Sequence, residues 1–403
     1  MWKLAARNLL RQKARTALTL GAIVLGIVGL VLSGGFVADI FIQLREATIH
    51  SQLGHLQLYR AGYYTKGRQA PYQYLIKDSD KQIVELRTVP HVVDVMPRVN
   101  FSGLLSNGRS SFPIFGDGVD PAKEAKLSKH LIIKEGRHLE PKDSYGIMLG
   151  AGVASALKLH PGDSISLLLN TPGGALNTLD LTVIGTFQTF SKDYDDRAVR
   201  IPLAAAWELL ATTAVHSLVF ALDDSNATDT VARELRSRLS REEFELKTWY
   251  ELSDFYEKTV ELYKRQFGVL GLIILGMVVL SVANSLGMTI YERTGEFGTL
   301  LALGNRTGQV FRLVLAESAI LGLTGGVIGT ILGVLIALTI SAIGIPMPPM
   351  PNTDFAYTAR IQLVPMDIAV AFLIGFCASV VAAISPARKM SRLSIVDALA
   401  RNI

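Results

Sequence analysis

The chain has 403 residues, a mean hydropathy of +0.33, 49% hydrophobic residues and 19% charged residues. It is too apolar for an ordinary soluble protein and too charged to lie wholly inside a membrane. The net charge of +5 comes from basic residues that flank apolar runs, which argues against a nucleic-acid-binding protein.

Four apolar windows are long enough to cross a bilayer as helices. They predict spans at residues 17–38, 267–290, 313–343 and 366–385. The remaining segments are an N-terminal segment (1–16), a large domain (39–266), a charged loop (291–312), a proline-rich loop (344–365) and a tail (386–403). The first window is too long for a cleavable signal peptide and no Ala-x-Ala site follows it, so we expect an uncleaved anchor.

The basic residues predict the orientation. They cluster before the first span, in the 291–312 loop and in the tail, whereas the 344–365 loop has only Arg360. By the positive-inside rule, both termini and the 291–312 loop are cytoplasmic and the 39–266 domain lies outside. We therefore expect a multi-pass membrane protein with both termini cytoplasmic. The only cysteine, Cys377, falls in the fourth span, so the outer domain has no disulfide.

The outer domain alternates strand and helix patterns, which predicts an α+β fold. Short strands are expected at 54–59, at two places within 92–106 and again at 111–116, with a helix that Pro90 stops. A β-α-β unit is expected over 217–249. The pattern does not give the strand register.

Apolar stripes extend both flanking membrane helices into this domain as stalks. On the return side, Thr248 and Glu251 fit a capping box at the start of the second stalk. Either the two stripes pack on each other, or they flank an entrance for an amphipathic substrate. The candidate groove residues are Ile40, Phe41, Leu44, Phe255, Tyr256 and Tyr263.

The sequence offers no catalytic motif. No glycine is followed by lysine, which excludes a Walker A loop, and neither His-Glu-x-x-His nor Gly-x-Ser-x-Gly occurs. The seven histidines are scattered, so we expect no metal site. The spans carry too few charges for an ion pathway. We expect neither an enzyme nor a channel, and no cofactor bound by this chain.

The 291–312 loop contains a short helical pattern that Gly304 would end. Phe297, Leu300 and Leu301 would share one apolar face, rimmed by Glu292, Arg293 and Glu296. Such a helix suits a groove of a soluble partner, and lying on lipid is the alternative.

Two further features mark the third span. Gly325, Gly329 and Gly333 form successive Gly-x-x-x-Gly steps, which serve either packing within the chain or a dimer face. Glu317, near the start of this span, needs either a partner or a position at the membrane interface. We expect the interface, because Arg312 lies barely more than one turn away.

The stretch "ERTGEFGTLLALGNRTGQVFRLVLAESAILGLTGGVIG" resembles the cytoplasmic loop and third span of the MacB, FtsX and lipoprotein-releasing (Lol) permeases of ABC transporters. The N-terminal "AARNLLRQKARTALTLGAIVLGI", the C-terminal "ISPARKMSRLSIVDALA" and the outer "GVDP", "EGRHL" and "VIGTF" are similar to the same family. The sequence departs from the family pattern at Gly295, Phe297 and Leu301.

The resemblance implies an inner-membrane permease that acts as one of two copies or paralogues. A separate ATPase subunit, which binds ATP and Mg²⁺, would dock on the 292–304 helix and drive movement through the stalks. Chain length favours the lipoprotein-releasing subgroup, which passes lipoproteins or other amphipathic envelope substrates to a periplasmic carrier. The alternatives are an FtsX-like scaffold that activates a periplasmic enzyme, and an efflux permease that works with an adaptor.

Overall fold

The computed structural model describes residues 2–11, 13–67, 70–127, 131–189, 191–348 and 356–391. The chain divides into two compact units. The helical unit comprises Met1–Phe41, Val260–Met347 and Tyr357–Ile403, and the α+β unit lies within Ile42–Thr259. The basic tail from residue 392 onward and the proline-rich loop at 349–355 lie outside the described residues.

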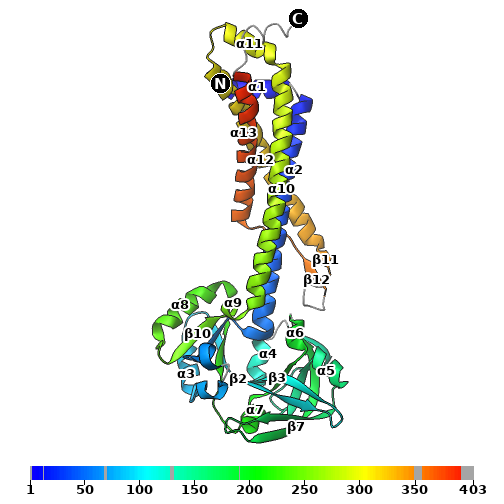
Figure 1. Ribbon diagram of the computed structural model, residues 1–403, viewed down its shortest axis with the longest axis vertical. Coiled ribbons are helices and arrows are strands. Elements are labelled where there is room, and N and C mark those ends of the chain that lie inside the picture. Colours follow the sequence, from blue (N-terminus) through cyan, green and yellow to red (C-terminus); the bar gives the residue numbers. More distant parts are fainter. Residues whose placement is uncertain are drawn as a thin grey trace. The chain divides into compact units, whose positions relative to one another are not determined.

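Four long helices contain the four predicted spans, and each has a window apolar enough to cross a membrane (Figure 1). They are α2 (Lys13–Thr48), α10 (Asp254–Glu292), α12 (Thr307–Ile343) and α13 (Pro365–Ser391). All four exceed the predicted spans, because a helical backbone needs no change at the point where lipid gives way to water. Helix α13 even continues through Pro386.

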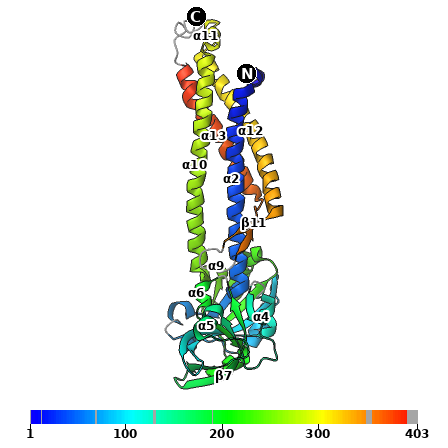
Figure 2. The same ribbon diagram turned by 90° about the vertical axis from the view of Figure 1, so that its right-hand side faces the viewer.

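A shared apolar core holds these helices together. Ile23 and Ile27 of α2, Val282 of α10, Leu321 of α12 and Ala378 of α13 all belong to one buried cluster. Figure 2 shows α12 and α13 beside α2 in the view turned by 90°. Two shorter helices, α1 (Trp2–Arg11) and α11 (Thr294–Ala302), complete the helical unit with the strand pair β11 (Ile345–Met347) and β12 (Tyr357–Ala359).

The α+β unit is built on one ten-stranded sheet. The strand order is β10-β1-β9-β2-β3-β8-β5-β7-β4, and β6 pairs with both β2 and β7. The strands are β1 (Leu56–Arg60), β2 (Val92–Ser106), β3 (Ser111–Val119), β4 (Ile132–Gly136), β5 (Gly146–Gly150), β6 (Ser164–Asn170), β7 (Leu176–Gln188), β8 (Ala198–Pro202), β9 (Ser217–Leu222) and β10 (Phe244–Thr248).

Strand β2 is one strand of 15 residues where two short strands were expected. Its first half pairs with β9 and its second half with β3 and β6, so it crosses from one part of the sheet to the other. The change of partner breaks the simple alternation of buried and exposed positions, and that alternation is the signal from which a strand is recognised in sequence.

Helices cover this sheet and close its core. They are α3 (Ser79–Leu86), α4 (Pro121–Leu127), α5 (Ala151–Leu157), α6 (Lys192–Asp195), α7 (Leu203–Leu210), α8 (Thr228–Arg238) and α9 (Trp249–Leu252). The predicted β-α-β unit is β9, α8 and β10. The capping box of Thr248 and Glu251 is present, but it caps α9, and the helix breaks at Ser253 before α10 begins.

Candidate functional site

The segment that joins α10 to α12 folds back as the short helix α11 (Figure 1). Helix α10 ends at Glu292, and Arg293 leaves the helical conformation before α11 begins at Thr294. At the other end Gly304 takes a φ of 92°, which a residue with a side chain rarely adopts, and α11 stops at Ala302. Local sequence thus sets the C-terminal end of α11.

Arg293 connects α11 to α12. Its Nη1 donates to both carboxylate oxygens of Glu317 on α12, each at 3.1 Å, and its Nε donates to Oε2 of Glu296 at 2.9 Å. Its guanidinium also lies over the ring of Phe297, 4.9 Å from the ring centre. Burial disfavours the charge of Arg293, but the carboxylates of Glu317 and Glu296 outweigh it and raise its pKa.

Glu317 has a partner within the chain, which was the less favoured of the two expectations. Its side chain is buried, with 4% of the residue exposed, and besides Arg293 it accepts a hydrogen bond of 2.7 Å from Nδ2 of Asn8 on α1. Arg312, the near neighbour in sequence, is exposed. We call Arg293, Glu296, Glu317 and Asn8 the Arg293 cluster.

The expected apolar docking face of α11 is also corrected. Phe297 is fully buried and Leu301 is 8% exposed, because both pack with Val310, Leu313 and neighbouring apolar residues of the same chain. Leu300 is only partly buried, at the edge of that cluster. Helix α11 uses most of its apolar face to hold itself in place, so these two side chains are not presented to a partner in this structure.

A groove of about 520 Å³ lies beside α11. Its wall includes one turn of α11 with Glu296, Thr299 and Leu300, together with residues of α1 and of the start of α12. We call it the α11 groove. The residues that line it are Asn8, Arg293, Glu296, Thr299, Leu300, Asn305, Gln309, Val310 and Leu313.

Helix α1 contributes to this site although the sequence was interpreted there only as a basic segment. Asn8 reaches Glu317, Arg11 reaches Oε1 of Glu296 at 3.3 Å, and Ala5 is buried in the cluster that contains Phe297. Ala5, Asn8 and Leu9 are spaced three and four residues apart, which is the signal that could have revealed a helix with one packed face.

The three glycines of α12 lie against α2. A methyl group on Gly325 would come within 2.8 Å of Ile23, and one on Gly333 within 3.2 Å of Val31. At Gly329 it would lie 3.2 Å from backbone atoms of Val24. This is the close backbone approach that glycine permits in membrane helices.

At the opposite end of the helical unit, Asp39 binds the segment that follows β12. Its carboxylate, 2% exposed, accepts hydrogen bonds from the backbone N–H of Arg360 at 2.9 Å and from Nε2 of Gln362 at 2.8 Å. Ser341 of α12 pairs with the backbone of Ile361. The segment therefore ties α2 to α12, a role that no local pattern in the sequence indicated.

The candidate groove residues of the stalks differ in how far their side chains are exposed. Ile40 and Leu44 are 2% and 1% exposed, so a substrate cannot reach their side chains in this structure. Phe41 and Tyr263 are partly exposed and meet edge to face, with ring centres 6.4 Å apart. Phe255 and Tyr256 are partly exposed as well, and Tyr256 packs on Trp249.

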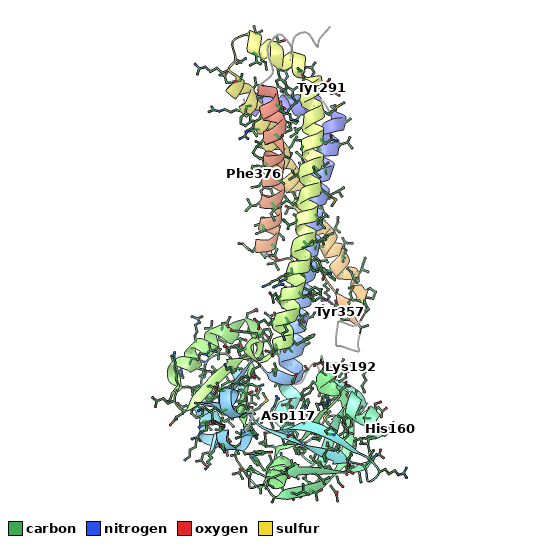
Figure 3. All side chains as sticks on the ribbon, in the orientation of Figure 1. Asp117, His160, Lys192, Tyr291, Tyr357 and Phe376 are labelled. Atoms are coloured by element: carbon green, nitrogen blue, oxygen red, sulfur yellow. The ribbon has the colours of Figure 1, made fainter. Side chains whose placement is uncertain are left out.

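A second buried charged cluster lies in the α+β unit, and we call it the Arg200 cluster. Glu124 of α4 accepts from Arg98 of β2 at 3.1 Å and from Arg200 of β8 at 3.0 Å. The same guanidiniums donate to the carbonyls of Gln52 and Ser51 in the π-helical turn Ile49–Leu53. Burial acts against the charge of Arg98, but Glu124 and then Asp117, which is labelled in Figure 3, raise its pKa.

Two family models match the chain. The one described as the MacB-like periplasmic core domain matches residues 16–238, which is more than half of the chain. The one described as the FtsX-like permease C-terminal domain matches residues 268–395.

Curated relatives agree with these matches. An uncharacterized ABC transporter permease of Methanocaldococcus jannaschii is 25% identical, over 66% of this chain and 65% of its own length. The lipoprotein-releasing system transmembrane protein LolC of Neisseria meningitidis is 22% identical, over 95% and 93%. The macrolide export ATP-binding/permease protein MacB of Hyphomonas neptunium is 22% identical, over 99% and 60%.

Among solved structures, the periplasmic region of MacB from Actinobacillus actinomycetemcomitans matches with a TM-score of 0.37 and 17% identity, covering 53% of this chain and 94% of that one. The predicted fold class, four membrane helices with an α+β domain between the first and second, is confirmed by the helices and the family models. The chain belongs to the family of ABC transporter permeases that carry a MacB-like periplasmic core domain and an FtsX-like permease C-terminal domain.

Proposed function

We propose that this chain is the permease subunit through which a separate ATPase drives removal of a lipoprotein, or another amphipathic envelope substrate, from the bacterial inner membrane. The observation that carries the proposal is the α11 groove, whose wall includes Arg293 and Glu296. Because Arg293 binds Glu317 on α12, and Glu317 binds Asn8 on α1, a displacement of α11 acts on both helices.

The same contacts support the proposed orientation. The bonds of Asn8 and Arg11 to Glu317 and Glu296 hold α1 next to α11, so the basic residues of both segments gather at one end of the helical unit. By the positive-inside rule that end is cytoplasmic, and with it both termini. The α+β unit is then periplasmic, where a carrier or adaptor protein meets it.

The nucleotide-binding site lies in the partner ATPase. ATP and Mg²⁺ bind the ATPase subunit, and nucleotide drives this chain only if the two nucleotide states bind its conformations with different affinity. A second permease, identical or paralogous, completes the transporter. Helix α10 supports a second copy, because Leu270, Ile273, Met277 and Leu280 are all exposed along it.

Coupling is tested by Leu300→Glu. The substitution places a charge in the α11 groove beside Glu296, and we expect it to abolish copurification of the partner ATPase. Leu176→Glu is the matched control, because Leu176 is 70% exposed on β7 of the α+β unit. If the ATPase stays bound to a folded Leu300→Glu variant as it does to the control, the α11 groove is not the docking site.

The substrate is tested in proteoliposomes that contain the permeases, the ATPase and a lipoprotein. Release to a soluble acceptor requires ATP, and Phe41→Gln and Phe255→Gln reduce it about tenfold by removing apolar contact with acyl chains. Leu176→Gln, at an exposed site of the α+β unit, leaves release unchanged. Wild-type release by variants that still fold would exclude these side chains from the acyl path.

The two alternatives rest on the matched relatives. The FtsX-like C-terminal match favours a scaffold that transmits a signal, and it predicts ATP-dependent activation of a periplasmic enzyme without lipoprotein release. The similarity to a macrolide export protein over 99% of this chain favours efflux, and it predicts stable copurification of an adaptor and an outer-membrane duct. The proteoliposome assay separates lipoprotein release from both alternatives, and enzyme activation or copurification then separates those two.

A further inference from the structure

A second hollow of the helical unit lies between α12 and α13, away from the Arg293 cluster. Its volume is about 410 Å³, and we call it the α12–α13 groove. Phe376, labelled on α13 in Figure 3, forms part of its wall. The residues that line it are Arg312, Leu315, Ala316, Ala319, Phe376, Cys377, Val380 and Val381.

The groove exists because small residues face larger ones on a neighbouring helix. Gly322 contacts Ser379, which holds α12 and α13 close together. One turn toward the start of α12, Ala319 and Ala316 offer only methyl groups, while Phe376 and Val380 form the opposite wall. The spacing 312, 315, 316, 319 keeps the α12 side on one helical stripe over about two turns.

Positive charge gathers at one end of this apolar groove. The helices run antiparallel, since Gly322 meets Ser379 and Gly326 meets Phe372, so the start of α12 lies near the end of α13. Arg312 lines the groove at that end and is exposed. Arg388 is exposed on α13, seven residues after Val381 and therefore on the same stripe. Among the described residues, those that line the groove include no acidic side chain.

We propose that the α12–α13 groove binds an anionic phospholipid, with an acyl chain between the helices and the phosphate at Arg312. The groove lies within two membrane-spanning helices, where its natural solvent is lipid, and basic pockets between such helices bind anionic head groups. The choice of leaflet, the cytoplasmic one, rests on the proposed orientation.

Lipid is a better occupant than a second copy of the chain. A stable protein interface takes roughly 20–30 residues on each side, and this groove offers eight. Helix α10 presents a longer unpartnered apolar surface. An exposed arginine at the rim of an apolar hollow also matches the two parts of a phospholipid, a charged head and an apolar tail.

The test uses the full chain alone in detergent, without the ATPase, so that its outcome does not depend on the proposed coupling. Native mass spectrometry counts the dioleoyl phosphatidylglycerol or phosphatidylcholine molecules that each chain retains. We expect phosphatidylglycerol to be preferred, and Arg312→Gln to reduce its retention about fivefold with phosphatidylcholine unchanged. Arg306→Gln is the matched control, because Arg306 is exposed before α12 and outside the groove lining.

A second variant tests the apolar part. Ala319→Phe fills the groove and leaves Arg312 in place, so it should abolish the preference, whereas Ala342→Phe at an exposed position of the same helix should not. Equal retention of the two lipids by the wild type, or equal effects of Arg312→Gln and Arg306→Gln, would overturn the proposal.

The only cysteine of the chain, Cys377, lies in the groove and reports on its occupant. A bimane label at Cys377, read in nanodiscs, should be quenched more strongly by phosphatidylglycerol with brominated tails than by the corresponding phosphatidylcholine. Oxidation of unlabelled membranes should give no disulfide between chains. A disulfide-linked dimer through Cys377 would instead show that a second copy covers this face and would refute lipid as the occupant.

Discussion

The two buried charged clusters of this chain use the same pair of residue types in opposite proportions. In the Arg200 cluster, one carboxylate, Glu124, lies between two guanidiniums that are almost completely buried. In the Arg293 cluster, one guanidinium lies between two carboxylates, and Glu296 remains about half exposed. The first cluster is sealed, whereas the second opens into the α11 groove.

The difference indicates which cluster can change its contacts. Removing one member of a sealed cluster leaves an uncompensated buried charge, which is strongly destabilising. A cluster with one exposed partner can exchange that partner for another protein or for water at lower cost. We therefore expect the Arg200 cluster to fix the turn Ile49–Leu53 rigidly in the α+β unit, and the Arg293 cluster to tolerate rearrangement.

The largest expected effect is that of Glu124→Ala. It leaves Arg98 and Arg200 buried without their shared carboxylate, and we expect a loss of about 3–5 kcal/mol in the free energy of unfolding. The measurement is denaturant unfolding of the full chain in detergent, followed by fluorescence of Trp207 and Trp249 in the α+β unit. Glu140→Ala, at an exposed ion pair with Lys142, should change little. Equal midpoints for the two variants would show that the Arg200 cluster is not sealed.

A second prediction concerns Asp195, which is 3% exposed. Burial raises its pKa from 3.8 to about 6, although hydrogen bonds from Thr189 oppose the rise. A raised pKa means that the folded state holds the proton more tightly, so the stabilisation is complete below pH 3.8 and is lost as the pH rises through 6. The loss is about 3 kcal/mol.

Asp195→Asn removes this titration while keeping an oxygen that accepts from Thr189. The variant should therefore gain stability relative to the wild type between pH 4 and pH 7, as measured by unfolding midpoints across that range. Parallel pH profiles for the two proteins would contradict the assignment. The same substitution at exposed Asp193, Asp193→Asn, serves as the control.

Glu317→Ala should cost less than Glu124→Ala, about 2 kcal/mol, because Arg293 keeps its bond to Glu296. The readout is the helical circular dichroism signal of the full chain during thermal unfolding in detergent. Glu257→Ala is the control, because Glu257 is exposed on α10. A loss as large as that of Glu124→Ala would mean that both clusters are equally rigid.

The smallest effect is expected at the exposed ion pair between Arg11 and Glu296. Arg11 and Glu296 form a 3.3 Å pair whose side chains are 80% and 47% exposed, so Arg11→Ala should cost about 0.5 kcal/mol or less. Added salt should remove even that difference, since exposed pairs are screened. If Arg11→Ala matched Glu317→Ala in thermal unfolding, exposure would not be what distinguishes the contact of Arg11 from that of Glu317.

Local patterns were sufficient wherever a segment's own sequence sets its structure. The apolar windows gave the four long helices, Gly304 marked the end of α11, and Thr248 with Glu251 formed a capping box. The sequence pattern failed where it had to predict what covers the apolar face of a helix. Phe297 and Leu301 formed an apolar stripe as expected, but a stripe does not show whether its own chain or another protein covers it.

Periodicity and charge in the sequence alone determined the number of spans, the α+β class of the domain between the first two, and the presence of a short helix between α10 and α12. Those features depend on hydrophobic length and on residues a few positions apart. Only the tertiary structure decided that Glu317 binds Asn8 and Arg293, that Asp39 holds the segment after β12, and that Arg98 and Arg200 share Glu124. These contacts join residues far apart in the chain, and the cost of burying each charge selects a partner that no local pattern contains.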